Sequence, residues 1–185
     1  MHRASKLLFA VVLLDLVGFG IVIPILPFLA PKLGGTEMDV GLIISTYALT
    51  AALLAPAWGR LSDRIGRKPV IIVCLTGAAA GYVLLGVAHE LWMLYAARAF
   101  AGAMAGNFGV ASAMMADITT PADRARGMGL IGAAFGLGLL LGPLLGGLLA
   151  GDGASFLWPA LMAGAMSLCA VVAAALFLPE SVNRE

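Results

Sequence analysis

The sequence predicts an all-α membrane protein with six transmembrane helices, and three features of its composition support this prediction. Apolar residues make up 62% of the 185 residues and charged residues only 11%, and the mean hydropathy is +1.03. Soluble domains average about 25% charged residues, so a water-soluble globule is excluded. Glycine contributes 24 residues, and small residues let membrane helices approach closely. The net charge of +1 gives no reason to expect nucleic acid as a partner.

Six apolar stretches are long enough to cross a bilayer, which takes about 20 residues each. Prolines, glycines and charged residues separate the stretches. They leave no room for a soluble domain, so we expect one six-helix domain over residues 1–185. The expected spans are residues 7–30, 40–60, 69–89, 91–116, 127–150 and 156–178.

The basic residues predict the orientation of these spans. Cytoplasmic loops of membrane proteins carry an excess of Lys and Arg. If the amino terminus is cytoplasmic, the opposite side holds only Lys32, and Arg98 falls inside the fourth span. We therefore expect both termini in the cytoplasm. The cations on that side are Arg3, Lys6, Arg60, Arg64, Arg67, Lys68, Arg124, Arg126 and Arg184.

The first span contains an ionisable residue and two prolines. Asp15 lies near its middle, where a charged side chain costs about 2.5–3.5 kcal/mol to insert. Such residues usually mark a proton or substrate site, although a static ion pair between helices remains the alternative. Pro24 and Pro27 lack backbone donors and are expected to bend the helix. Bent helices at membrane depth are tolerated where they line a cavity, and ordinary helix packing is the alternative.

The loop between the second and third spans combines cations with one carboxylate. The carboxylate is that of Asp63, which lies between two glycines and is therefore expected to be held in a fixed turn. The cations serve as an orientation signal, whereas a carboxylate adds nothing to one and could contact the positive end of another helix. Such a contact would latch one conformation shut, and residues 59–68 are called the gate segment below. Its candidate residues are Gly59, Asp63, Arg64, Gly66, Arg67 and Lys68.

The fourth span carries Arg98, followed by Gly102. At a rise of 1.5 Å per residue, Arg98 and Asp15 lie within about 5 Å of the same depth in the bilayer. The two side chains could pair directly or through water across a cavity. Asn107, nine residues after Arg98, is expected on the opposite helix face, where it would bond another helix outside the site.

The fifth span repeats small residues at helical spacing. Gly138, Gly142 and Gly146 allow a neighbouring backbone to approach, and Pro143 is expected to bend the helix. A nucleotide-binding glycine loop is rejected because no strand precedes it. Since no nucleophile–base pair, metal-ligand set or phosphate loop is evident, we expect neither an enzyme nor a bound cofactor.

Together these residues resemble the amino-terminal half of a major facilitator superfamily transporter, and more narrowly the drug:proton antiporters of the tetracycline-efflux type. The resemblance covers nearly the whole chain. It comprises Asp15 through Pro27, the gate segment 59–68, Arg98 with Gly102, residues 116–126 and the glycine–proline pattern of residues 136–147. Those exporters place an acidic residue before a tyrosine of the third span, where this chain has Gly81 and Tyr82.

The resemblance implies a fold of two inverted three-helix repeats and roles for the residues above. Asp15 and Arg98 would form the proton-coupling and substrate-organising pair in a cavity lined by spans one and four. Residues Asp63, Arg64 and Arg67 would form the cytoplasmic gate. The implied function is proton-coupled export of small amphipathic, tetracycline-like drugs across a bacterial-type cytoplasmic membrane. Its partners are membrane lipid, the drug and protons.

Members of this superfamily have twelve spans, whereas six are predicted here. The two halves of such transporters are parallel repeats, so two identical copies could generate the arrangement around a two-fold axis. Spans two and five would then meet their symmetry mates, and we expect a homodimer. The alternatives are a different second half, a truncated chain, or a non-transporting membrane scaffold or sensor.

Overall fold

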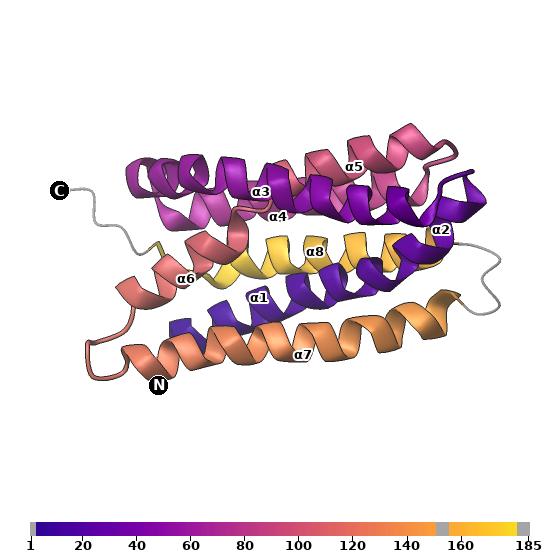
Figure 1. Cartoon of the computed structure of the whole chain (residues 1–185). Helices are drawn as coiled ribbons and strands as arrows, with labels where there is room; N and C mark the ends of the chain where they lie inside the picture. The colour runs from indigo at the N-terminus through magenta and orange to yellow at the C-terminus, as the bar shows by residue number, and fades with distance from the viewer. Residues whose placement is uncertain (1–2, 151–155, 181–185) are drawn as a thin grey trace.

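A computed structural model describes residues 3–150 and 156–180 of the chain (Figure 1). Arg184, counted above among the basic residues, lies outside the described residues. The described residues form eight α-helices and one short 3₁₀ helix. These are α1 (Arg3–Val22), η1 (Ile23–Ile25), α2 (Leu26–Lys32), α3 (Glu37–Ile65), α4 (Arg67–Gly86), α5 (Leu91–Ala103), α6 (Asn107–Asp117), α7 (Arg124–Ala150) and α8 (Leu157–Phe177).

Six helical segments are long and apolar enough to cross a membrane. The first combines α1, η1 and α2, because the chain tightens into the 3₁₀ turn around Pro24 and then continues as a helix. The fourth combines α5 and α6, which are separated by a break at residues 104–106. The second span is longer than expected and covers Glu37–Ile65. The described residues therefore have the six-helix architecture that the sequence predicted.

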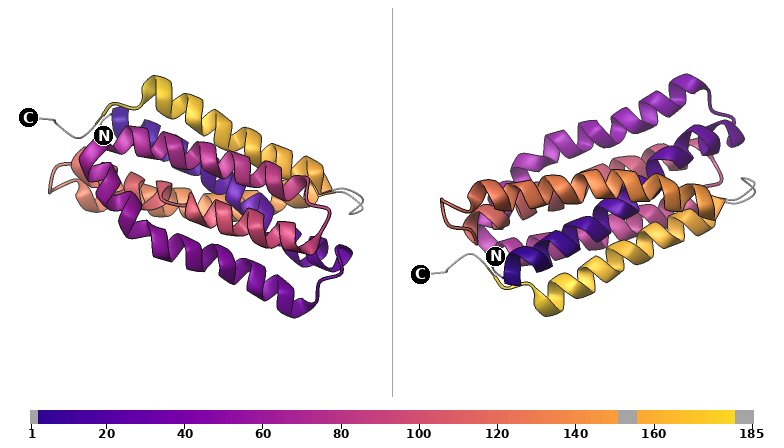
Figure 2. Two further views of the ribbon diagram at one scale, coloured as in Figure 1. Left: turned by 90° about the horizontal axis from the view of Figure 1, so that it is seen from above. Right: turned by 90° about the horizontal axis from the view of Figure 1, so that it is seen from below.

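All the strongly basic connections lie at one end of this bundle. The start of α1 and the end of α8 are at the same end, as are the α3–α4 junction and the loop from α6 to α7 (Figures 1 and 2). Because the chain has an even number of spans, the start of the first span and the end of the last must lie at the same end of the bundle. The described basic residues that the sequence predicts on one side of the membrane therefore lie together at one end of the folded bundle.

Helix α1 packs between α7 and α8, and its contact with α7 depends on glycine. A Cβ added at Gly20 would lie 2.6 Å from the carbonyl oxygen of Gly138. One added at Gly146 would lie 2.8 Å from the carbonyl oxygen of Ile21. The two backbones are in direct contact, so larger side chains at these positions would force α1 and α7 apart.

The gate segment is not a loop, contrary to the expectation from its glycines and charges. Residues 59–65 form the last two turns of α3, and Asp63 therefore lies on a helix rather than in a turn. The chain changes direction at Gly66 alone, whose φ of +110° is readily accessible only to glycine. Helix α4 begins at the next residue. The sequence did not show this because the glycine at position 59 is tolerated inside a membrane helix.

Helices α3 and α7 are the least buried of the six crossings. Only 6% of the most apolar window of α3 is buried, and 22% of that of α7, against 61% for the first span. Figure 2 shows α3 at the outer edge of the bundle, opposite α8. On α7 the glycines at positions 129, 132, 136 and 147 have no atom within 4 Å of an added Cβ. Both helices thus present long apolar faces that no other described part of the chain covers.

Candidate functional site

A partly open cavity of about 280 Å³ is bounded by residues of α1, α3, α4, α6 and α7, with α5 and the break that follows it. Its wall is mostly aromatic and aliphatic. Two polar groups with strong hydrogen-bonding capacity, Asp15 and Asn107, interrupt it. The lining residues are Asp15, Leu16, Phe19, Tyr47, Ala78, Tyr82, Ala101, Ala105, Asn107, Phe108 and Phe135.

Asp15 is the only carboxylate among these lining residues, and its side chain is almost fully buried, at 6% exposure. One oxygen, Oδ1, accepts a hydrogen bond from the Ser167 hydroxyl of α8 at 3.1 Å. The other, Oδ2, accepts one from the amide of Asn107. Both donors are neutral, and the structure records no ion pair of Asp15 within the described residues. The carboxylate is therefore hydrogen-bonded but has no neighbouring cation to neutralise it.

The position of Asn107 corrects the expectation that it lies outside the site. A continuous helix would have placed it on the face opposite Arg98. Instead α5 ends at Ala103, and α6 begins at Asn107 after the break, so the helical spacing does not extend across residues 104–106. The break turns the amide of Asn107 toward Asp15. No proline marks this position in the sequence, and the signal that could have shown it, Gly102 with Gly106, also reads as ordinary helix packing.

Arg98 does not pair directly with Asp15. It is 2% exposed, and its guanidinium stacks over the Tyr47 ring with 4.2 Å between the guanidinium carbon and the ring centroid. Its Nε has no hydrogen-bond partner in the described residues. The cation is stabilised by the electron-rich face of the ring, as is common for arginine. Tyr47 itself lines the cavity, so the arginine lies behind the wall rather than in it.

The position before Tyr82, where this chain has Gly81 instead of an acidic residue, lies at a close contact between two helices. A Cβ at Gly81 would lie 2.9 Å from the Cβ of Ala101 and 3.3 Å from its Cα. Helices α4 and α5 therefore approach so closely at Gly81 that an acidic side chain would require α5 to move. The adjacent Tyr82 is 4% exposed and lines the cavity.

Arg67 organises a polar cluster at the end of the bundle where α3 meets α4. Its guanidinium contacts Asp63 at 2.6 Å, Asp117 at 3.1 Å and the Ser62 hydroxyl at 2.7 Å. Its backbone N–H donates to Glu180, which follows α8, at 2.9 Å. The sequence identified Asp63 and Arg67 as gate candidates but gave no such role to Ser62, Asp117 or Glu180. Asp117 and Glu180 lie 50 and 113 positions from Arg67, so no local pattern could connect them.

The remaining gate candidates do not join this cluster through ion pairs. Arg64 is exposed and Lys68 is partly exposed, and the described part of the chain records no ion pair of either. Gly59 has open space around it, and Gly66 provides the turn. The structure therefore concentrates the interactions of the segment on Arg67.

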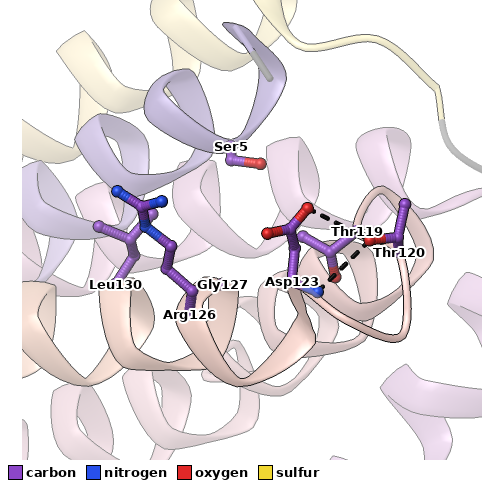
Figure 3. Close-up of a pocket in the computed structure, with 7 residues that line it drawn as sticks. All are labelled: Ser5, Thr119, Thr120, Asp123, Arg126, Gly127 and Leu130. Atoms are coloured by element: carbon purple, nitrogen blue, oxygen red, sulfur yellow. Dashed lines mark hydrogen bonds between the residues drawn. The ribbon is translucent and has the colours of Figure 1, made fainter. Parts of the chain in front are cut away.

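A second cavity, of about 230 Å³, lies at the same end, between the start of α1 and the loop before α7 (Figure 3). Ser5, 3% exposed, lines it with Thr119, Thr120 and Asp123. Thr120 and Asp123 bond each other, with the Thr120 hydroxyl donating to the carboxylate at 3.2 Å and accepting from the Asp123 N–H at 3.3 Å. These bonds order the chain ahead of α7, and the cavity is separate from the one that contains Asp15.

Comparison with known proteins agrees with this architecture. The family model described as Major Facilitator Superfamily matches residues 8–185. The chain is 35% identical over its full length to the class H tetracycline resistance protein of Pasteurella multocida, and 42% identical over 80% of its length to the class C protein of Escherichia coli. It is also 32% identical over its full length to the human major facilitator superfamily domain-containing protein 10.

A solved structure has the same fold. The crystal structure of the human organic anion transporter MFSD10 superimposes with a TM-score of 0.86 and 28% identity, over 98% of this chain and 48% of that one. The chain spans 46%, 38% and 46% of the three relatives above. Its match is to the amino-terminal part of the tetracycline resistance proteins. The chain belongs to the Major Facilitator Superfamily, as a six-helix unit similar to the amino-terminal half of tetracycline-efflux transporters.

Proposed function

We propose that the chain forms half of a proton-coupled exporter of small amphipathic drugs, in which Asp15 gains and loses the coupled proton. The observation that carries this proposal is the position of Asp15. It is a buried carboxylate on the wall of a partly open cavity, near the middle of the first apolar span, with only neutral hydrogen-bond donors on its oxygens. A charged side chain is costly in this environment, and ionisable residues within membrane spans therefore usually have a functional role.

The geometry supports exchange of a proton for a substrate at one place. Protonation removes the uncompensated charge, whereas a substrate that brings a positive group or hydrogen-bond donors to the carboxylate stabilises it. The two events therefore compete for Asp15, and by linkage each weakens the other's binding. This competition is the requirement for antiport. Arg98 would act through Tyr47, whose ring separates it from the cavity.

The cavity wall supports the class of substrate. Phe19, Phe108 and Phe135 join the two tyrosines around a single carboxylate and a single amide. Apolar walls with a few placed polar groups are typical of sites for amphipathic organic molecules. The relatives named as tetracycline resistance proteins favour a tetracycline-like compound, and the human relative is described as an organic anion transporter. We propose an amphipathic drug and use tetracycline as the probe.

The proposed partner is a second copy of the chain. Transporters of this type pair two parallel halves about an axis normal to the membrane, and a two-fold axis between identical copies has the same geometry. The faces of α3 and α7 are open and apolar, with glycines on α7 that could admit a close neighbour. The basic end of the bundle would face the cytoplasm of a bacterial-type cell. A different second half is the alternative partner.

The proton role is tested in proteoliposomes with an imposed pH gradient. We expect Asp15→Asn to abolish tetracycline uptake driven by the gradient, while Glu37→Gln, which removes an exposed carboxylate at the start of α3, leaves it unchanged. Gradient-driven uptake that persists in Asp15→Asn would show that another group carries the proton. An absence of uptake by the unaltered chain would contradict a homodimeric exporter and would leave a different second half, or a scaffold or sensor, as the alternatives.

The partner is tested by cysteine cross-linking in membranes, after replacement of the exposed native Cys169. Leu53→Cys on α3 and Leu140→Cys on α7, in differently tagged copies, should form a cross-link. Leu176→Cys on α8 is a matched control, since the three leucines are 67%, 68% and 68% exposed. Efficient uptake without any α3–α7 cross-link between copies would point to a different second half.

A further inference from the structure

The break in the fourth span is held by a side chain from another helix. In an α-helix the carbonyl of residue 103 would accept a hydrogen bond from the N–H of residue 107. The structure records no such bond in the described residues. The indole N–H of Trp58, on α3, donates to the Ala103 carbonyl at 2.6 Å instead. The Ala103 carbonyl, which has no helical partner at the break, therefore accepts its hydrogen bond from a side chain of α3. In apolar surroundings a carbonyl without a hydrogen-bond partner would be costly.

Gly106 provides the space for the Trp58 ring. A Cβ added at Gly106 would lie 2.6 Å from the Cβ of Trp58, 2.7 Å from its ring carbon Cδ1 and closer still to its Cγ. The ring therefore occupies the volume that any other residue at position 106 would fill. The hydrogen bond and the steric fit together fix where α5 ends and where α6 begins.

We propose that Trp58 is a positioning residue for the proton site, because it holds the break that presents the amide of Asn107 to Asp15. Asn107 is the first residue of α6, directly after Gly106, and its amide donates to the Asp15 carboxylate. A change in the break must therefore change that contact. Trp58 itself does not line the cavity, so it acts through Asn107. This inference rests on the proposed role of Asp15.

The same residue links the proton site to the Arg67 cluster. Trp58 and Ser62 are four residues apart on α3 and so lie on one face of it. Ser62 is fully buried and accepts a hydrogen bond from Arg67 at 2.7 Å. A rigid-body movement of α3 away from α4 and α5 would break both the Ser62–Arg67 contact and the bond from the indole to Ala103. Opening of the cluster would thereby be communicated to Asp15 through a rigid helix and two hydrogen bonds.

The test is an infrared pH titration of the Asp15 carboxyl band in the full chain in lipid nanodiscs, assigned by subtraction of the Asp15→Asn spectrum. We expect Trp58→Phe and Asn107→Ala to displace the titration midpoint in the same direction and by the same amount. The double variant should show no further displacement, because both changes break one connection. Gly106→Ala, which pushes the ring from its place, should reproduce the effect.

Trp92→Phe is the matched control, since the indole N–H of Trp92 donates to Glu90 at the opposite end of the bundle from the Arg67 cluster. The titration midpoint of Asp15 in this variant should equal that of the wild type. In tetracycline–proton exchange, Trp58→Phe should lower the rate about two- to twelvefold, the value of one neutral hydrogen bond. A wild-type midpoint in Trp58→Phe overturns the inference, and so do displacements that add in the double variant. The titration does not require transport, so it fails independently of the exchange assay with Asp15→Asn.

Discussion

Replacement of Gly138 by alanine tests whether α1 and α7 are in backbone contact. A Cβ at Gly138 would lie 2.6 Å from the Cβ of Leu16 and 2.8 Å from its carbonyl carbon. The carbonyl carbon cannot move without displacing α1. Gly136, two positions earlier on α7, has no atom within 4 Å of an added Cβ. The two glycines thus differ in packing while sharing one helix and nearly one depth.

The comparison isolates the packing contribution. Alanine is favoured over glycine in a helix by about 0.8–1.0 kcal/mol, and this contribution is the same in both variants. Overfilling a packed interior costs roughly 1–3 kcal/mol. We therefore expect Gly138→Ala to unfold with a free energy about 1–3 kcal/mol lower than that of Gly136→Ala, while Gly136→Ala is at least as stable as the wild type.

The assay is unfolding by sodium dodecyl sulfate in mixed micelles, followed by circular dichroism. A low protein concentration ensures that contacts between copies do not contribute. Equal unfolding free energies for Gly138→Ala and Gly136→Ala would refute the close contact between α1 and α7. A loss in Gly136→Ala instead would mean that the open face of α7 is packed within one copy.

Two further substitutions test the turn after α3 and the environment of the buried cation. Gly66→Ala should destabilise the chain by about 1–3 kcal/mol, because a side chain is strained at a φ of +110° and would meet Glu180. Gly59→Ala, in open space, should not, and equal stability of these two variants would contradict the turn geometry. Arg98→Lys keeps the charge but loses the flat group stacked on Tyr47, for an expected cost of about 0.5–2 kcal/mol in the same unfolding assay. Tyr47→Leu should add little to Arg98→Lys, and fully additive losses would argue against the stacking.

The sequence predicted the parts of the site that depend on one residue and its depth. Asp15 and Arg98 were recognisable because a charge within a twenty-residue apolar stretch is costly wherever its partners lie. Asp63 and Arg67 were recognisable because charges concentrated between two spans are unusual. In each case the signal was local, and no knowledge of neighbouring helices was needed.

The partners of these residues were not predictable in the same way. A continuous helical period predicts the wrong face for Asn107, because the helix is interrupted at residues 104–106 and no proline marks the interruption in the sequence. Arg98 contacts an aromatic ring rather than the carboxylate at its own depth. Depth in the membrane is a one-dimensional property, whereas the choice of partner depends on how the helices are rotated about their axes.

The sequence by itself therefore determined the number of membrane crossings, the placement of the charges among them and the asymmetry of the two ends. These follow from the thickness of the bilayer and the cost of placing charge in it, which act on each segment separately. Only the tertiary structure decided that Asn107 and Ser167 bond Asp15, that Trp58 holds the break in the fourth span, and that Glu180 caps α4. These contacts join segments far apart in the chain, and they exist because close packing of helices through glycine fixes which faces meet.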